Sequence, residues 1–258
     1  MKIGQDYQGV MKNLILALIS LGSILDGRAQ LAPSQHHSTA YGQTAFALPK
    51  GAKLYQNTML SGNHLQFGQT NSTSIGVGAC PIYFKQAGFQ VFSAVNVSHA
   101  FKFNEREALR VGAIGGIGYA PNDASTSDFG GLFALYSRKI TDFDLATLGY
   151  GYYGSSIYYP PHLHQFSLNY KRAFKNSRLG LEVGAVVGWS QSNWGFEDWG
   201  TIWRVVNWRP NLVLTKKFDG GNSVFLGISG LTYAEWTPSD GSDNYRLMWP
   251  TFGYSRYF

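Results

Sequence analysis

Apolar and polar residues alternate with a period of two through the second half of the chain. The segment 179–189 reads LGLEVGAVVGW, so its odd-numbered positions are all apolar, whereas Glu182 and all three of its glycines occupy even-numbered positions. The same alternation runs through 164–172 and 205–215. Successive side chains of a β-strand point to opposite faces of a sheet, whereas a helix would scatter these residues around its axis. The pattern therefore predicts strands with one apolar and one polar face.

Short runs of Asn, Asp, Gly, Ser, Thr and Pro divide the chain into segments of strand length. We predict about twelve strands, near 40–48, 52–69, 73–84, 88–102, 107–120, 128–138, 143–156, 162–173, 178–192, 202–217, 222–236 and 245–258. The connections alternate in length. The tight ones lie at 70–72, 104–106, 140–142, 175–177 and 219–221, and most of those between them are longer.

An even number of strands, with short turns at one end and longer loops at the other, is typical of outer-membrane barrels. We therefore expect an all-β, antiparallel up-and-down transmembrane β-barrel. Both termini and every tight turn should lie at one end of it. The connections around 49–51 and 85–86 should lie at the other end, although both are short.

Composition favours the same architecture. Charged residues make up only 14% of the chain, against roughly 25% in ordinary soluble domains. Aromatic residues reach 16%, and many lie near expected strand ends, as in the girdles of membrane barrels. The net charge of +6 is spread along the chain without a run of Lys or Arg, so we expect no nucleic-acid partner. Cys80 is the only cysteine, which excludes an internal disulfide and a cysteine-based zinc site.

The N-terminal region has the pattern of a signal peptide. Residues 14–25 read LILALISLGSIL and carry no charge. This run is too short to span a bilayer as a helix, which needs about 20 residues. The small residues Gly27 and Ala29 follow it, at the two positions that a signal peptidase reads. Because Asp6 is acidic and such leaders usually begin with basic residues, we interpret 1–10 as an upstream mis-start.

The end of the chain, TFGYSRYF at 251–258, resembles the C-terminal assembly signal of bacterial outer-membrane proteins. Thr251, Gly253 and Phe258 match that signal, whereas Arg256 stands where an apolar residue is usual. In that family the signal is recognised by the barrel-insertion machinery. The resemblance therefore implies this machinery as a partner during assembly and outer-membrane lipid as the final surroundings.

A second resemblance covers residues 48–78, which read LPKGAKLYQNTMLSGNHLQFGQTNSTSIGVG. A Lys-Gly turn, a Tyr-Gln-Asn strand and a Gly-x-Gly strand follow one another there. This order is similar to the front part of small outer-membrane barrel proteins of Bacteroidota, a group with no assigned activity. The resemblance implies a fold and a location but no mechanism.

If the apolar strand faces contact lipid, the polar faces line the lumen. We expect that lining to include Arg110, Gln165, Asn169, Lys171, Glu182, Asn207, Arg209 and Asn211. Buried charges must be paired or hydrated, so these residues either knit a closed lumen or line a wet pore. Steps of two residues from the turn at 175–177 bring Asn169 and Lys171 near Glu182. We expect Glu182 to point inward, within salt-bridge reach of Lys171 or Arg209.

Catalytic and metal-binding chemistry is sparsely signalled. His162 and His164 share one face of a strand and could bind a metal ion, but no carboxylate is close in sequence, so we expect no metal and no cofactor. The pairs Ser98-His99 and Asn63-His64 resemble parts of the Ser/His/Asn sets of membrane lipases. Adjacent strand residues point to opposite faces, so neither pair forms a dyad by itself, and an enzyme is the less favoured interpretation.

Three functional classes remain. A barrel of twelve strands can leave some lumen open, so a passive channel or binding barrel for small solutes in the outer membrane comes first. A structural or interaction barrel with a filled lumen comes second, and a membrane-embedded lipid hydrolase third. An open path flanked by Arg110 and Arg209 would favour a channel, whereas interlocked side chains would favour the structural class.

We predict that residues 1–29 are removed, so that the mature barrel domain, 30–258, begins at Gln30. The physical reason is the short apolar run followed by small residues before the Ala29–Gln30 bond. N-terminal sequencing of protein recovered from outer membranes checks this expectation. A mature chain that retains residues 14–25 would contradict it.

Overall fold

A computed structural model describes the parts of the chain that form the barrel. The described residues are 38–39, 42–58, 62–84, 88–120, 125–155, 162–174, 178–194, 201–237 and 241–258. The expected signal peptide and its cleavage site at Ala29–Gln30 lie outside them. Within the described part of the chain, no helix is both long and apolar enough to cross a membrane.

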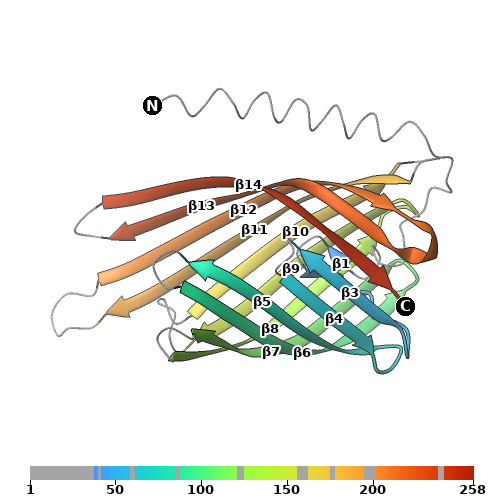
Figure 1. The fold of residues 1–258 in the computed structure, drawn as a ribbon, viewed down its shortest axis with the longest axis horizontal. Helices are drawn as coiled ribbons and strands as arrows, with labels where there is room; N and C mark the ends of the chain where they lie inside the picture. Colours follow the sequence, from blue (N-terminus) through green and yellow to red (C-terminus); the bar gives the residue numbers. More distant parts are fainter. Residues whose placement is uncertain are drawn as a thin grey trace.

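The wall of the molecule is one antiparallel sheet of twelve strands that closes on itself (Figure 1). Each strand pairs with the next along the chain, and the last one pairs with the first. The all-β up-and-down barrel expected from the residue pattern is therefore confirmed. The wall strands are β3 (Lys53–Thr58), β4 (Gly62–Gly68), β5 (Thr73–Phe84), β6 (Gly88–Asn104), β7 (Glu107–Ala120), β8 (Ser125–Lys139), β9 (Asp144–Ser155), β10 (His162–Ala173), β11 (Leu179–Trp194), β12 (Thr201–Lys217), β13 (Ser223–Thr237) and β14 (Gly241–Tyr257).

The barrel closes where β14 meets β3. Residues 253–257 pair with 54–58 in antiparallel register. Lys53 and Phe258 extend the seam by exchanging two backbone hydrogen bonds of 3.1 and 2.9 Å. Gly253 and Phe258, the residues of the expected assembly signal, are thus both part of the closing ladder.

Two of the strands expected from the sequence are wrong, and the two errors cancel in the number of wall strands. The segment 52–69, expected as one strand, is a hairpin in which β3 pairs with β4. The sequence signals no turn there because the connection begins with apolar Met59 and Leu60. The segment 40–48, expected as the first wall strand, contributes no strand to the wall, so the number of wall strands is still twelve.

The two ends of the barrel carry different connections. We define the turn end as the one with the C-terminus and the connections at 69–72, 105–106, 140–143 and 218–222, and the loop end as the opposite one. Residues 49–51, expected at the loop end, lie at the turn end. There Gly51 N donates to Gly68 O at 2.8 Å, and Lys50 N donates to Asn71 Oδ1 at 3.1 Å. The expectation is wrong because it treated β3 and β4 as one strand. Each strand reverses the direction of the chain, so one additional strand moves every earlier connection to the opposite end of the barrel.

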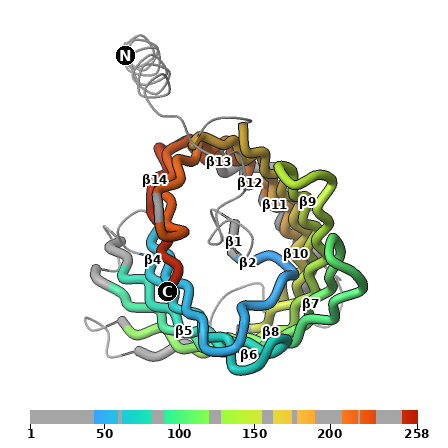
Figure 2. The backbone as a smooth tube through the Cα atoms, turned by 90° about the vertical axis from the view of Figure 1, so that its right-hand side faces the viewer, coloured from blue at the N-terminus to red at the C-terminus, as the bar shows by residue number. Residues whose placement is uncertain are grey.

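Residues Gln43 to Leu48, here called the N-terminal segment, run inside the barrel. Figure 2 shows the short pair β1 (Ser38–Thr39) and β2 (Gly42–Gln43) within the ring of wall strands. Three residues of the segment are fully buried. Ala45 N donates to Ser137 Oγ at 2.8 Å, and Phe46 packs against the cluster of Leu145 and Ala173. Because Leu145 and Ala173 are turn-end residues of β9 and β10, the segment fills that end of the lumen.

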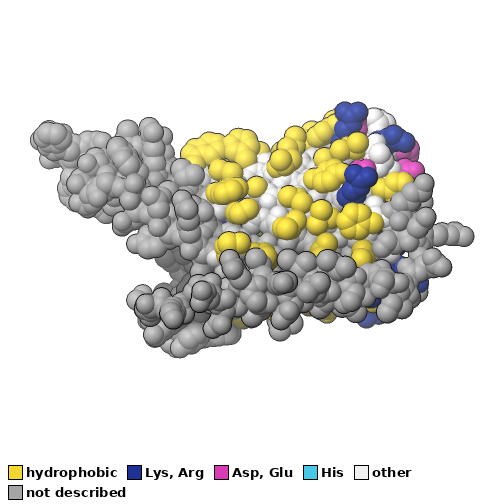
Figure 3. Space-filling view, turned by 90° about the horizontal axis from the view of Figure 1, so that it is seen from above, with side chains coloured by type: hydrophobic (Ala, Val, Ile, Leu, Met, Phe, Trp, Pro, Cys, Tyr) yellow, Lys and Arg dark blue, Asp and Glu magenta, His cyan; other side chains and the backbone are white. Residues whose placement is uncertain are grey.

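The outer surface carries a broad apolar band, and charged side chains gather at one end of it (Figure 3). The band includes Leu148, Leu168 and Leu212, each about half exposed. The charged end is the turn end, where Lys102 and Glu105 form an exposed ion pair of 2.5 Å. This distribution is the reverse of a soluble barrel, which keeps its apolar residues inside.

We predict that Gly68→Ala destabilises the barrel by about 1–3 kcal/mol, because the new methyl group overpacks a closed site. A Cβ at Gly68 would lie 2.0 Å from Pro49 O, where the chain leaves the lumen and enters β3. Gly115→Ala is the matched control, since the nearest atom to a Cβ there is 3.9 Å away. Thermal unfolding in detergent micelles, followed by heat-modifiable gel migration, measures the difference. Equal unfolding temperatures for the two variants would contradict this packing.

Candidate functional site

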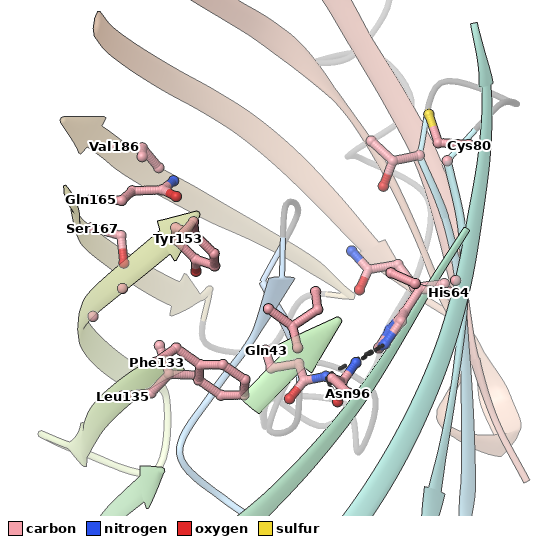
Figure 4. A pocket seen from close by; sticks show the side chains of 18 of the residues that line it. Gln43, His64, Cys80, Asn96, Phe133, Leu135, Tyr153, Gln165, Ser167 and Val186 are labelled. Carbon is pink, nitrogen blue, oxygen red and sulfur yellow. Dashed lines mark hydrogen bonds between the residues drawn. The ribbon is translucent and has the colours of Figure 1, made fainter. Parts of the chain in front are cut away.

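A cavity of about 570 Å³ lies in the lumen on the loop side of the N-terminal segment (Figure 4). Its lining comes from β3 through β12 and from Gln43 of that segment. We call it the lumen cavity. A second hollow of about 530 Å³ lies on the turn side, between Phe46, Pro49, Lys102 and Lys139. The N-terminal segment therefore lies between two hollows.

Strand register brings the polar lining residues together. Residues that pair across neighbouring strands of an antiparallel sheet face the same side, and His64 on β4 pairs with Gln56 on β3 and with Gly78 on β5. Gly76 has no side chain, and the side chains of His64 and Asn96 meet in the space that is left there. A Cβ there would lie 2.5 Å from Asn96 Nδ2 and 2.6 Å from His64 Nε2.

The floor of the lumen cavity is a chain of hydrogen bonds from a buried arginine to a histidine. Arg110 Nη1 donates to Gln43 Oε1 at 2.6 Å, which fixes the orientation of that amide. Gln43 Nε2 then points to His64 Nε2 at 3.5 Å and to Asn96 Oδ1 at 3.4 Å, and Asn96 Nδ2 lies 3.2 Å from His64 Nε2. Both amide groups are donors, so His64 Nε2 is the acceptor and its ring is neutral. Figure 4 shows the side chains of Gln43, Asn96 and His64 close together, with dashed lines for the hydrogen bonds among them.

Arg110 anchors the N-terminal segment. The residue is 0% exposed, and its Nη2 donates a second hydrogen bond to Phe46 O. Both acceptors belong to the segment, which is more than 60 residues away in sequence. A buried guanidinium without acceptors would cost several kcal/mol, so this charge strongly favours the lodged position of the segment.

A second polar network lies on the opposite wall. Lys171 Nζ is 3.2 Å from Glu182 Oε2, and their side chains are only 5% and 1% exposed. Asn169 Nδ2 donates to Glu182 Oε1 at 2.7 Å. Val213, the register partner of Glu182 on β12, is fully buried. This part of the lumen is filled with interlocked side chains.

The structure places seven of the eight lumen candidates, all except Asn207, on the inward phase of their strands. Arg110, Lys171 and Glu182 lie in the two buried networks, and Gln165, Asn169 and Asn211 line the lumen cavity. Arg209 pairs with Val186, four residues along β12 from Val213, so Lys171 and not Arg209 is the ion partner of Glu182. The backbone of Asn207 pairs with Gly188, and its side chain lies outside the described part.

Sequence reasoning missed several residues of the cavity. Gln43 was assigned to a wall strand, and His64 and Asn96 were not included in the lumen lining. Three inward aromatic residues, Phe129, Phe133 and Tyr153, were also missed. The period-two phase of β8 and β9 could have found these three, because they alternate with outward residues. No local signal could have found Gln43.

The histidines considered for catalysis or metal binding have amide and hydroxyl groups as neighbours. His64 hydrogen-bonds with the side-chain amides of Gln43 and Asn96. His162 and His164 point outward, where their Nδ1 atoms lie 3.0 and 2.9 Å from the hydroxyls of Tyr152 and Tyr150. Among the described residues, no three His, Cys, Asp or Glu side chains are grouped to hold a metal ion.

No model of a known protein family matches this chain, and no curated protein matches it.

We predict that Glu182→Ala lowers the free energy of unfolding by about 3–5 kcal/mol, because it leaves the Lys171 ammonium buried without its carboxylate. The double variant Glu182→Leu with Lys171→Met removes both charges and should recover most of that loss. Thermal unfolding in detergent micelles measures both. If the double variant is no more stable than Glu182→Ala, the ion pair is not the reason for the loss.

Proposed function

We propose that this protein is an outer-membrane β-barrel that binds a small solute in its lumen and is closed toward the turn end by its N-terminal segment. The observation that carries the proposal is the fully buried Arg110, whose two hydrogen bonds hold the segment across the lumen. Ligand sites in small barrels lie in the mouth of the barrel, where the lumen cavity of about 570 Å³ is found.

The outward residues of the wall support a membrane location. The outward positions within 146–152, 164–170, 181–189 and 208–214 carry no Asp, Glu, Lys or Arg. The stretch 181–189 alone covers about 26 Å of strand at roughly 3.3 Å per residue. A tilted transmembrane β-strand needs about 9–11 residues, and the nine residues of 181–189 reach the lower end of that range.

The orientation of the barrel is part of the proposal. A signal peptide before Gln30 and an assembly signal ending at Phe258 would direct the chain to the insertion machinery of the outer membrane. The turn end would then face the periplasm, because short turns face it in such barrels. The lumen cavity would open toward the cell exterior, on the far side of the N-terminal segment. A kinship with small Bacteroidota barrels would fit this arrangement.

A closed binding barrel accounts for the lumen better than an open channel. A wet pore needs a continuous path, whereas Arg110 is buried under Gln43 and Phe46. The second candidate is a structural barrel with a filled lumen, and the buried Lys171–Glu182 pair beside Val213 favours this candidate for the part of the lumen near the turn end. The lumen cavity remains on the loop side of that part, which is why solute binding comes first.

We predict that the whole protein gives little or no conductance in planar bilayers, whereas a variant lacking residues 38–48 conducts. The deletion removes the N-terminal segment and leaves the twelve wall strands, so an aqueous path should open. Phe101→Ala is the control, since Phe101 lies on the outer face of β6. Steady conductance of the unaltered protein would contradict closure by the segment.

Access to the cavity can be tested at the same time. Cys80 is the only cysteine and lines the lumen cavity. On whole cells, a small methanethiosulfonate reagent should modify Cys80 of the folded protein, and mass spectrometry should show no adduct on Cys80→Ser. Modification that occurs only after unfolding would favour the filled structural barrel over a binding barrel.

A further inference from the structure

The side chains that line the lumen cavity are uncharged. Among the described residues that line it there is no Asp, Glu, Lys or Arg, although the chain has a net charge of +6. The nearby charges lie outside the described lining: Arg110 is bound by the N-terminal segment, Lys171 is paired with Glu182, and Arg209 lies on the inward phase of β12 but is not a lining residue. An anionic or cationic solute would thus lose its hydration without meeting an opposite charge among the described lining residues.

One wall of the cavity is aromatic. Phe129 and Phe133 on β8 and Tyr153 on β9 line it (Figure 4 labels Phe133 and Tyr153). A Cβ at Gly112, the register partner of Phe133, would lie 2.4 Å from Phe133 Cζ. The ring therefore leans over the neighbouring strand instead of projecting to the barrel axis.

The other two rings are placed in the same way. A Cβ at Gly116, the partner of Phe129, would lie 2.5 Å from Phe129 Cζ. A Cβ at Gly131 or Gly151 would lie 2.5 Å from atoms of the Tyr153 ring. Three rings that cover glycine backbone make a continuous apolar wall and leave the volume in front of them open.

Hydrogen-bonding groups line the rest of the cavity. They are amides, hydroxyls and one neutral imidazole, on Gln56, His64, Asn96, Gln165, Ser167 and Asn169. An amide side chain offers both donors and acceptors. The hydrogen bonds to Gln43 hold His64 and Asn96 in fixed positions before any solute enters.

We propose that the lumen cavity binds a neutral saccharide of about one to three rings, a size that suits a pocket of this volume. This inference rests on the proposed function. A sugar ring has an apolar C–H face, which can stack on the aromatic wall. Its hydroxyls, each a donor and an acceptor, match the amides and hydroxyls opposite. A fatty acyl chain would offer those polar groups no additional hydrogen-bonding partner, which weakens its binding relative to a sugar.

The test uses Cys80 as a reporter, with the full protein folded in a detergent that has no sugar headgroup. Modification of Cys80 by methyl methanethiosulfonate is timed with glucose, maltose, glucuronate or laurate present. Competition for one site should slow modification about tenfold when a bound sugar is at about ten times its dissociation constant. Glucose or maltose should give this protection, and glucuronate and laurate should not.

Variants assign the protection to the aromatic wall. Phe133→Leu keeps an apolar side chain but removes the ring, so about fivefold more sugar should be needed for half-protection. Phe101→Leu is the matched control on the outer face and should leave the value unchanged. Thermal unfolding of both variants shows that the barrel is folded.

The outcomes separate the two proposals. If Cys80 reacts but glucose and maltose do not protect it, or if laurate or glucuronate protects it better, the saccharide inference is overturned while solute binding stands. The same holds if Phe133→Leu requires no more sugar than Phe101→Leu. If Cys80 of the folded protein does not react at all, the proposed binding barrel itself fails.

Discussion

Backbone hydrogen bonding between β14 and β3 turns an open sheet into a barrel, and the other features of the molecule depend on that closure. A sheet with a free edge exposes unpaired N–H and C=O groups, which is untenable in lipid. Pairing of 253–257 with 54–58, extended by Lys53 and Phe258, joins the two edges of the sheet toward the turn end. Once the wall is closed, alternate residues of every strand face either the lumen or the outside. The apolar band, the buried ion pair and the lumen cavity are all consequences of this division.

The inside of the barrel divides into a packed part and an open part. Near the turn end, Arg110 engages the N-terminal segment, and Lys171 on β10 pairs with Glu182 on the neighbouring strand β11. These charges are buried, so each needs its partners to remain in place. Toward the loop end a hollow of about 570 Å³ remains, and the described residues that line it are uncharged. Placing the charges in the packed part leaves the open part to hydrogen bonds and aromatic contacts.

Gln43 links the two parts. The oxygen of its side-chain amide accepts a hydrogen bond from Arg110 in the packed part, and the nitrogen of the same amide points to His64 and Asn96 in the open part. A displacement of the N-terminal segment would therefore remove both the seal at the turn end and the support of the two cavity residues. Closure of the lumen and the shape of the cavity are in this way coupled through one side chain.

The sequence by itself determined the fold class, the strand phase of the second half and the neighbourhood of Glu182. These features are local: alternation fixes which face a residue takes, and the turn at 175–177 fixes which residues of a hairpin meet. Only the tertiary structure decided that 52–69 is a hairpin and that 43–48 lies inside the lumen. A segment on the inside and a strand in the wall can carry the same short pattern of apolar and polar residues. The choice between them rests on contacts between residues far apart in the chain, such as Arg110 with Gln43, and a local pattern carries no information about such contacts.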